Sequence, residues 1–398
     1  MRVLISGAGV AGLAVAYWLE QYGFQPTIVE RADALRTGGY KIDVRGKALD
    51  VLRRMEIYDE VKASSTDMQG ATIVDRDGKV IAEMSGDAFG LREGDDLEIV
   101  RGDLCQIMKN KLKNVEFLFG DSIRAISQNS NDVAVEFEKN QPRSFDLVIG
   151  ADGLHSQVRR HVFGDEALFA RHLGLYLCVY SVPNYLNLDR WEMEYTDLGK
   201  IANIWSSKGG KDAKACFGFT APEYTFDPRN IASQQQLVKM VYKDIGWQVP
   251  RLLQEMDKTT DFYFDAATLI CMDHWSKNRV VLLGDAGYCA SPMSGQGTSL
   301  ALIGAYLLAG EQALASPNHQ RAFSEYERNL RPFVKANQAL GIKSANLMRT
   351  REKKSFLLWL HNLMIKFAPG WWVAFFTNRA KARIARAANA ITLPAYPR

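Results

Sequence analysis

The first thirty residues carry the feature that most constrains how this chain can fold. A β-branched segment, 2–6, runs directly into the glycine-rich turn GAGVAG at 7–12, and an apolar helical segment, 13–20, follows. A second strand-like segment, 27–30, ends in an acid. Strand, glycine turn, helix, strand and acid in this register predict a βαβ unit that binds the pyrophosphate of a dinucleotide.

Each glycine of this turn has a physical task. The first permits a tight turn, the second leaves room for a pyrophosphate, and the third lets the helix pack closely on the strand. The start of the helix offers unpaired N–H groups and a favourable dipole to phosphate. The acid can accept hydrogen bonds from ribose hydroxyls. The predicted nucleotide contacts in this segment are Gly7, Gly9, Ala11, Gly12, Glu30 and Arg31.

Two other interpretations of the same residues exist. Residues 1–19 are short and apolar enough for a signal peptide, and a glycine-rich turn can also bind nothing. The spacing of the three glycines, with the acid that follows, favours the nucleotide site over both. The turn does not distinguish FAD from NAD, so that choice depends on residues further along.

Two later segments each run a buried strand into an aspartate. One, SFDLVIGADG, ends in Asp152-Gly153, and the other, RVVLLGDA, contains Gly284-Asp285. Ligands of open α/β sheets bind at the carboxyl ends of parallel strands, so both carboxylates are predicted to contact a cofactor.

The second of these segments leads into a further glycine loop. The chain passes Pro292 and reaches Gly295-Gln296-Gly297 at the start of the apolar helix 298–309. Backbone N–H groups at a helix start have no partner within the helix. They can therefore hold the polar edge of a ring.

The three motifs, in this order and spacing, resemble those of the flavoprotein monooxygenases of the para-hydroxybenzoate hydroxylase type. The resemblance implies FAD, with Asp285 on the ribityl chain and residues 295–297 at the isoalloxazine edge. It also implies that Asp152 and Gly153 serve FAD and a transient NADPH or NADH. Arg101, in EIVRGDL, matches the arginine that reaches the flavin nucleotide in that family. A strand-ending arginine is otherwise often a salt-bridge partner.

A closer resemblance, spread over the whole chain, is to the FAD-dependent tetracycline destructases. It implies an enzyme of antibiotic resistance that hydroxylates an aromatic or polycyclic, tetracycline-like molecule through a flavin hydroperoxide, with NAD(P)H and O2. Tyr288, Ser299 and Gly304 stand where the broader family has His, Asn and Asp, so roles of those side chains are not carried over. The matching stretches are GGYKIDVRG (38–46), PNYL (183–186), DFYFD (261–265), GDAGYCASP (284–292) and ITLP (391–394).

Arg45, within the first of these stretches, is the candidate catalytic residue. We expect it near the flavin edge, where it would hold a substrate or the reductant. The alternative is a solvated loop arginine.

The order of elements predicts an α/β fold with a Rossmann-like FAD-binding domain, a second, mainly antiparallel β-sheet substrate domain and a C-terminal helical tail. We expect the FAD-binding domain in two parts, 1–165 and 277–339. Short alternating strands with a polar helical insert place the substrate domain at 166–276. The tail is 340–398. Candidate pocket-lining aromatics in the sheet are Tyr195, Trp205, Phe217 and Phe219, although for any single one of them a place in the core is the commoner outcome.

Charge and cysteine content limit the partners. The net charge is only +4, which disfavours nucleic acid. Residues 340–398 hold eleven Lys and Arg and one acid, so the tail carries +10 and the rest of the chain −6. Five cysteines without a CxxC pair, and six histidines without ligand spacing, disfavour disulfides and metals. We expect a cytoplasmic monomer without an integral membrane segment.

The tail predicts helices at 318–348, with Pro332 in a first turn, at 353–367 and at 371–388. One interpretation, favoured by the resemblance, is a clamp that closes across the two domains. The other is an interfacial amphipathic helix that makes weak contact with a membrane surface. Its apolar residues would be Trp359, Phe367, Trp371, Trp372, Phe375 and Phe376.

Two competing functions remain at this point. One is an aromatic-acid or secondary-metabolite hydroxylase without activity on tetracyclines. The other is a flavin-fold binding protein that has lost catalysis, which the three intact nucleotide motifs disfavour.

Overall fold

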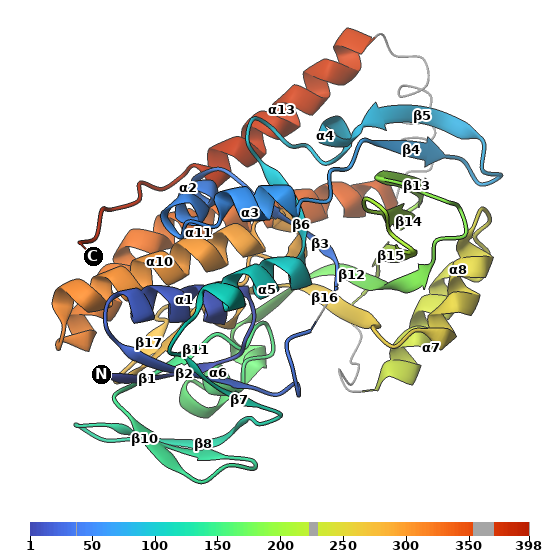
Figure 1. The fold of residues 1–398 in the computed structure, drawn as a ribbon. Coiled ribbons are helices and arrows are strands. Elements are labelled where there is room, and N and C mark those ends of the chain that lie inside the picture. Colours follow the sequence, from blue (N-terminus) through green and yellow to red (C-terminus); the bar gives the residue numbers. More distant parts are fainter. Residues whose placement is uncertain (37, 223–229, 353–369, 398) are drawn as a thin grey trace.

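The computed structural model describes residues 1–36, 38–222, 230–352 and 370–397. Within these residues, the sheet that begins at the N-terminus has six strands in the order β17-β18-β11-β1-β2-β7 (Figure 1). Neighbouring strands are parallel except β17 and β18. The strands are β1 (Arg2–Ser6), β2 (Gln25–Glu30), β7 (Glu116–Phe119), β11 (Leu147–Gly150), β17 (Ser276–Lys277) and β18 (Val280–Leu282). Because β1 is central, the glycine turn after it opens in the middle of the carboxyl edge.

Apolar helices cover this sheet, and β1 is therefore buried on both faces from Val3 onward. Helix α1 (Val10–Gln21) packs against α10 (Gly297–Ala315), and the Trp18 and Tyr306 rings meet edge to face with 4.9 Å between centroids. By length and composition, α10 is the one helix of the described residues that could cross a membrane. However, 78% of its apolar window is buried inside the fold, as expected for a core helix.

Shorter elements connect the main ones. Two small antiparallel sheets are β3 (Lys41–Val44) with β6 (Leu97–Val100), and β8 (Ile123–Gln128), β9 (Val133–Phe137) and β10 (Arg143–Phe145). The remaining helices of this part are α2 (Lys47–Arg54), α3 (Tyr58–Ala63), α4 (Gly86–Phe89), α5 (Arg101–Lys111), α6 (Gln157–Val162) and α9 (Asp285–Tyr288). Single 3₁₀ turns occur at Glu166–Leu168, Met256–Lys258 and Pro292–Ser294.

The second sheet has seven strands in the order β16-β12-β15-β14-β13-β4-β5 among the described residues. All its pairings are antiparallel except β4 with β13, so the sheet is mainly antiparallel, as predicted. Two of its strands come from residues 70–85, which the sequence placed in the first part of the FAD-binding domain. The strands are β4 (Gly70–Val74), β5 (Val80–Ser85), β12 (Ala170–Pro183), β13 (Trp191–Asp197), β14 (Lys200–Ser206), β15 (Asp212–Thr220) and β16 (Tyr263–Ile270).

The two faces of this sheet have different neighbours. Helices α7 (Ile231–Tyr242) and α8 (Val249–Glu255) cover one face, which we call the outer face. The opposite, inner face is met by residues of the nucleotide-binding part: the Tyr40 ring lies beside Tyr263, and His155 contacts Asp265. Side chains alternate between faces along each strand. The strand registers therefore assign to the inner face Val179, Glu192, Glu194, Asn203, Trp205, Lys214, Cys216, Tyr263 and Asp265.

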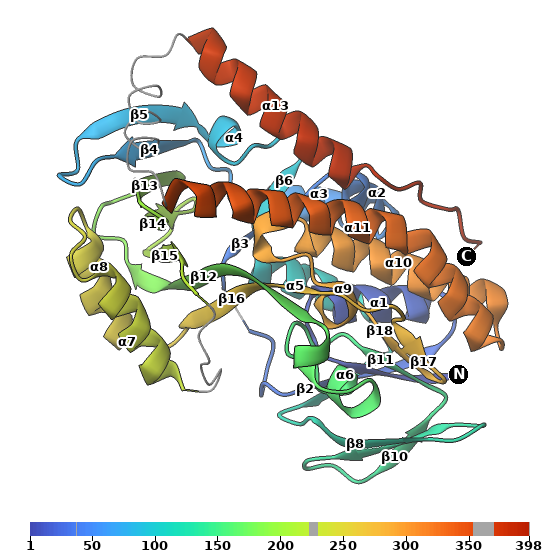
Figure 2. The same cartoon turned by 180° about the vertical axis from the view of Figure 1, so that it is seen from behind.

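A long helix joins the two parts. Helix α11 (His319–Glu352) packs on α10 and runs on to the second sheet, where Ala345 lies in a cluster with Leu173 and Leu175 of β12 (Figure 2). Pro332 lies inside this helix. The helix predicted at 318–348 is therefore confirmed, although Pro332 lies in its interior and not in a first turn. The helix predicted at 353–367 falls outside the described residues.

The C-terminal segment returns to the nucleotide-binding part. Helix α13 (Gly370–Ala388) ends against α11, where the Asn337 amide donates to the Ala387 carbonyl at 3.4 Å. Further on, the Tyr396 hydroxyl donates to Glu311 of α10 at 2.7 Å. The tail is thus tied to the body at its C-terminal end. Phe375 and Phe376, 57% and 53% exposed, lie further back along α13.

Candidate functional site

The glycine turn after β1 has the geometry that its sequence predicts. Gly7 adopts φ +102°, and a Cβ there would lie 2.6 Å from the Ala151 carbonyl oxygen. A Cβ on Gly12 would overlap the Gly7 carbonyl oxygen, so helix and strand touch at this point. A Cβ on Gly9 would meet only the Arg101 guanidinium, at 3.1 Å. Packing within the protein therefore requires Gly7 and Gly12, whereas the space above Gly9 is open to a ligand.

Glu30 and Arg101 flank this turn. The Glu30 carboxylate accepts the Ala8 N–H at 2.8 Å and the Ala32 N–H at 2.9 Å, which fixes it beside the turn. Arg31, next to it, is exposed. Arg101 begins α5, and no carboxylate of the described residues lies within 4.0 Å of its guanidinium. The salt-bridge alternative for Arg101 therefore has no support here, and the group remains available for a phosphate.

The second aspartate motif joins the first glycine turn. A Cβ on Gly284, at φ +67°, would lie 3.1 Å from Ala11. Asp285 starts α9, and burial raises the pKa of its carboxyl, although part of its surface is accessible. A carboxyl that is surrounded by protein but still accessible, as that of Asp285 is, is typical of the wall of a cavity. Gly7, Ala11, Arg101 and Asp285 therefore line one site.

Asp152 has a different environment. Its carboxylate accepts the Ser156 hydroxyl at 2.5 Å and the N–H groups of Gln157 and Val158 at 2.8 and 3.1 Å. These hydrogen bonds hold the turn that leads into α6. Gly153, at φ +80°, has open space around it. Any contact of this turn with FAD or nicotinamide stays a prediction.

The loop before α10 contains polar groups that the protein does not satisfy. Gln296 is fully buried, and neither polar atom of its side chain has a hydrogen-bond partner in the described structure. Gly295 is left-handed at φ +63°, and a Cβ on Gly297 would meet nothing within 4 Å. Buried polar atoms are rarely left unpaired. Together with the adjacent Pro292 turn, this loop fits the polar edge of a flavin ring.

Arg45 is neither solvated nor free. It is 4% exposed, and its guanidinium donates to the carbonyls of Gly90 and Leu91, both at 2.7 Å. It also pairs with Asp43 at 2.9 Å and Asp96 at 3.5 Å. The solvated-loop alternative is therefore wrong. This geometry favours a positioning role, because Asp43 in turn lies beside Gly295, over a direct hold on substrate or reductant.

The structure corrects the prediction for three of the four candidate aromatics. Phe217 and Phe219 lie on the outer face, fully buried, with the Tyr242 ring of α7 at 4.7 and 6.1 Å between centroids. Tyr195 shares this face and packs near Trp247. These three are core residues. Trp205 alone of the four lies on the inner face, where the Lys41 ammonium sits 5.2 Å from its ring.

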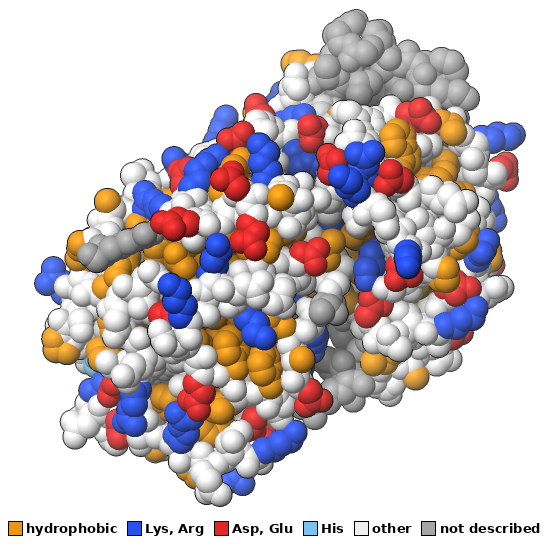
Figure 3. Space-filling model, viewed as in Figure 1, with side chains coloured by type: hydrophobic (Ala, Val, Ile, Leu, Met, Phe, Trp, Pro, Cys, Tyr) orange, Lys and Arg blue, Asp and Glu red, His pale blue; other side chains and the backbone are white. Residues whose placement is uncertain are grey.

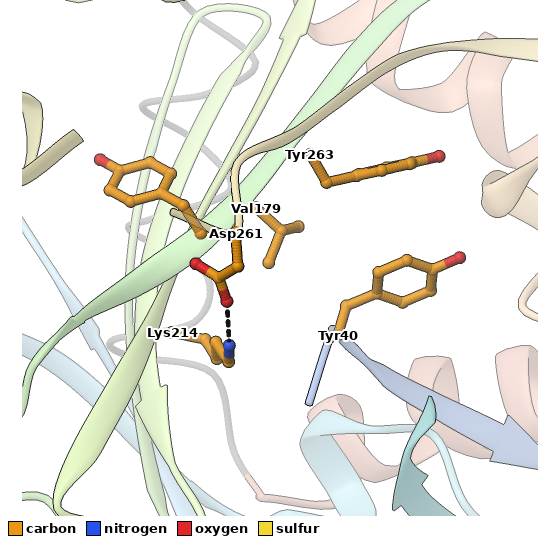
Figure 4. A pocket seen from close by; sticks show the side chains of 7 residues that line it. Tyr40, Val179, Lys214, Asp261 and Tyr263 are labelled. Carbon is orange, nitrogen blue, oxygen red and sulfur yellow. Dashed lines mark hydrogen bonds and ion pairs between the residues drawn. The ribbon is translucent and has the colours of Figure 1, made fainter. Parts of the chain in front are cut away.

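The inner face contains functional candidates to which the sequence assigned no role. Tyr40 and Tyr263 lie with 5.4 Å between ring centroids and turn their hydroxyl ends the same way (Figure 4). Together with Val179, Lys214 and Asp261, they line a small cavity. The stretches 38–46 and 261–265 marked these positions only through resemblance.

Two ion pairs lie on or beside this face. The Lys214 ammonium donates to Asp261 and to the Ser181 hydroxyl, both at 2.6 Å. Burial raises the pKa of Asp261, but these hydrogen bonds outweigh it and hold that pKa below its ordinary value. Lys41 pairs closely with Glu192 and lies 3.8 Å from Glu98. Lys214 and Lys41 are thus both neutralised.

Comparison with known proteins agrees with this geometry. The FAD binding domain family matches residues 1–339. A flavin-dependent monooxygenase of Legionella longbeachae is 39% identical over 396 residues, covering 100% of this chain and 98% of that protein. The crystal structures of the tetracycline destructases Tet(51) and Tet(55) align with TM-scores of 0.87 and 0.86 at 37% and 39% identity. They cover 100% and 99% of this chain, and 99% and 98% of their own.

These matches confirm the α/β fold with FAD as cofactor and the resemblance stated from the motifs. They also make the chain an enzyme and set aside the non-catalytic alternative. The protein belongs to the FAD-binding-domain family of flavin-dependent monooxygenases.

Proposed function

We propose that this monooxygenase uses NAD(P)H and O2 to hydroxylate a fused-ring, tetracycline-like small molecule. One observation carries the proposal: the whole chain aligns with Tet(51) at a TM-score of 0.87 and 37% identity. The match includes the second sheet and the helical tail as well as the nucleotide-binding part. Those are the regions that differ most among proteins that share only a cofactor fold.

The chemistry divides between the cofactor and the protein. Bound FAD would take two electrons from NAD(P)H and use O2 as oxidant. One oxygen atom converts a C–H bond of the substrate into C–OH. The other leaves as water, which takes up the hydrogen supplied by NAD(P)H and one proton from solution. Gly9 and Arg101 would hold the pyrophosphate, Asp285 the ribityl hydroxyls, and Gln296 the ring edge.

The protein itself positions the substrate and excludes water. The inner face of the second sheet lies opposite the carboxyl edge that carries these groups, so a substrate between them would be held against the flavin ring. The Tyr40 and Tyr263 rings supply flat apolar surface there. Tetracyclines are flat and partly aromatic, which suits such a surface.

A substrate panel tests the proposal. FAD-loaded protein is mixed with NADPH or NADH and with tetracycline, para-hydroxybenzoate or phenol, and both NAD(P)H loss and product mass are followed. We expect tetracycline to accelerate NAD(P)H loss and to gain one oxygen atom. Turnover of the simple phenols but not of tetracycline would instead support an aromatic-acid or secondary-metabolite hydroxylase.

A further inference from the structure

One row of the inner face leads away from the tyrosine pair. In register across five strands stand Tyr263, Val179, Cys216, Asn203 and Glu194. Neighbouring strands lie about 4.8 Å apart, so the row runs for about 14 Å from Val179 to Glu194. A rigid, elongated molecule laid along this row would have one end at the tyrosines and the other at Glu194.

Glu194 is the carboxyl of this row without a counter-ion. The neighbouring Glu192 is neutralised by Lys41, and Asp265, beside Tyr263, contacts His155 at 3.4 Å. Glu194 accepts a hydrogen bond from the Thr196 hydroxyl at 3.2 Å. No Lys, Arg or His of the described residues lies within 4.0 Å of its oxygens. It is only partly exposed.

Asn203 provides an independent observation at the same place. It stands directly opposite Glu194 on β14. Its Oδ1 atom is buried and has no hydrogen-bond partner among the described residues. Buried acceptors of this kind are costly unless a donor reaches them. A carboxyl without a counter-ion and an amide oxygen without a donor therefore converge at one end of the row.

We propose that Glu194 and Asn203 bind a protonated amine, or an amine with an adjacent donor, at one end of an elongated fused-ring substrate. The assignment rests on the proposed function and adds to it the polar group of the substrate that the enzyme recognises. Charge supports an amine over an acid, because an anion there would face an uncompensated carboxylate. Trp205 lies next to Asn203 along the same strand face and offers an aromatic surface to a cation.

The titration of Glu194 predicts how the affinity for an amine should depend on pH. Burial, and then the charge of Glu192, raise the pKa of Glu194 to about 7. The other groups that face it are Lys41 from β3, Cys216 and Asn203. An amine binds the ionised carboxylate best, so affinity should rise with pH through about 7 and level off while the amine stays protonated.

The experiment measures binding by calorimetry to the oxidised, FAD-loaded enzyme from about pH 6 to about pH 8. The probes are tetracycline and the analogue that lacks its dimethylamino group. The variants are Glu194→Gln and Asn203→Ala, and Glu83→Gln on β5 is an exposed control in the same sheet. FAD content and melting temperature report on folding.

We expect Glu194→Gln to weaken tetracycline binding about 10- to 100-fold and to abolish its pH dependence. The affinity for the analogue should fall far less. Asn203→Ala should also weaken the binding of tetracycline more than that of the analogue, with a smaller loss than Glu194→Gln. Equal losses for both probes, or no loss for either, would overturn the assignment and leave the proposed function standing. Wild-type protein that binds neither probe would overturn both.

Discussion

At the residue scale, glycines of the nucleotide turn separate folding from cofactor binding. A methyl on Gly12 would overlap the backbone of Gly7, whereas a methyl on Gly9 would displace only the end of the flexible Arg101 side chain. We therefore expect Gly12→Ala to lower the unfolding free energy of the apoprotein by about 1–3 kcal/mol. Gly9→Ala should leave apoprotein stability unchanged and weaken FAD binding by about tenfold or more. Thermal unfolding of the apoprotein and FAD titration by flavin fluorescence measure the two effects, and equal destabilisation by both substitutions would contradict this division.

Arg45 gives a second test at this scale. Its removal would leave Asp43 and Asp96 without their cation and the carbonyls of Gly90 and Leu91 without a donor. We expect Arg45→Met to cost about 3–5 kcal/mol of unfolding free energy, since breaking a buried ion pair leaves an uncompensated charge.

The matched control for Arg45 is Arg53→Met. The Arg53 side chain is 42% exposed and pairs with Asp50 and Asp95, so its loss should cost less than about 1 kcal/mol. Denaturant unfolding compares the two variants. If Arg45→Met proved as stable as the control while substrate turnover collapsed, the direct substrate role predicted from the sequence would be restored.

The sequence could predict the position of residues that depends on local chain geometry. The glycine turn, Glu30 and the aspartate motif at Asp285 fall where their spacing predicts. Phe217 and Phe219 show the limit of this reasoning. Their spacing indicates that they share a face, but α7 decides which face is buried, and that contact lies outside the strand.

At the element scale, the turn 151–156 is linked to the second sheet through His155. Its ring nitrogens contact Asp265 of β16 at 3.4 Å and Glu166 at 3.0 Å. Hydrogen bonds to Asp265, and then to Glu166, raise the pKa of His155 from 6.5 to about 10. The folded state therefore binds this proton more tightly than the unfolded state, and the resulting stability is complete below about 6.5 and is lost as pH rises through about 10.

The prediction is a pH-dependent difference between wild type and His155→Gln. Melting temperatures should differ most from about pH 6 to 6.5 and converge near about pH 10. The control variant is His319→Gln. Burial lowers the pKa of His319, and no carboxylate contributes to that shift. A wild-type advantage that stays constant across this range would show that the ring acts by packing rather than by charge.

The helical tail permits a test of its two interpretations. Ala387 and Ala388 are buried against the body, while Phe375 and Phe376 are exposed. Because the C-terminal end is held by Asn337 and Glu311, we expect no flotation with vesicles that contain phosphatidylserine. Flotation that the double substitution Phe375→Ser and Phe376→Ser abolishes would instead establish the interfacial helix.

The sequence did not predict how strands pair when their partners lie far apart along the chain. Strands β4 and β5 join the second sheet through the parallel pairing of β4 with β13, more than a hundred residues along the chain. Local pattern identifies a strand but not such a partner. Local pattern did predict the helix at 318–348, which is α11, and only the place of Pro332 within that helix differs.

At the scale of the whole molecule, the inner face of the second sheet meets the nucleotide-binding part, and α11 packs on both. Lys and Arg side chains are interspersed with Asp and Glu over the view in Figure 3, which gives no broad basic surface for a polyanion on that side. Fold and cofactor followed from three short motifs, because each motif is a continuous stretch whose spacing is visible in the sequence. The proposed substrate surface did not, because it is assembled from five strands and from β3.

The most direct test of the account is the origin of the inserted oxygen. FAD-loaded enzyme, NADPH and tetracycline are incubated under isotopically labelled O2 in ordinary water, and the product is analysed by mass spectrometry. We expect one labelled oxygen atom in the product and consumption of one NADPH for each product molecule. A product that carries oxygen from water, or that forms without NADPH, would contradict a flavin monooxygenase mechanism for this substrate.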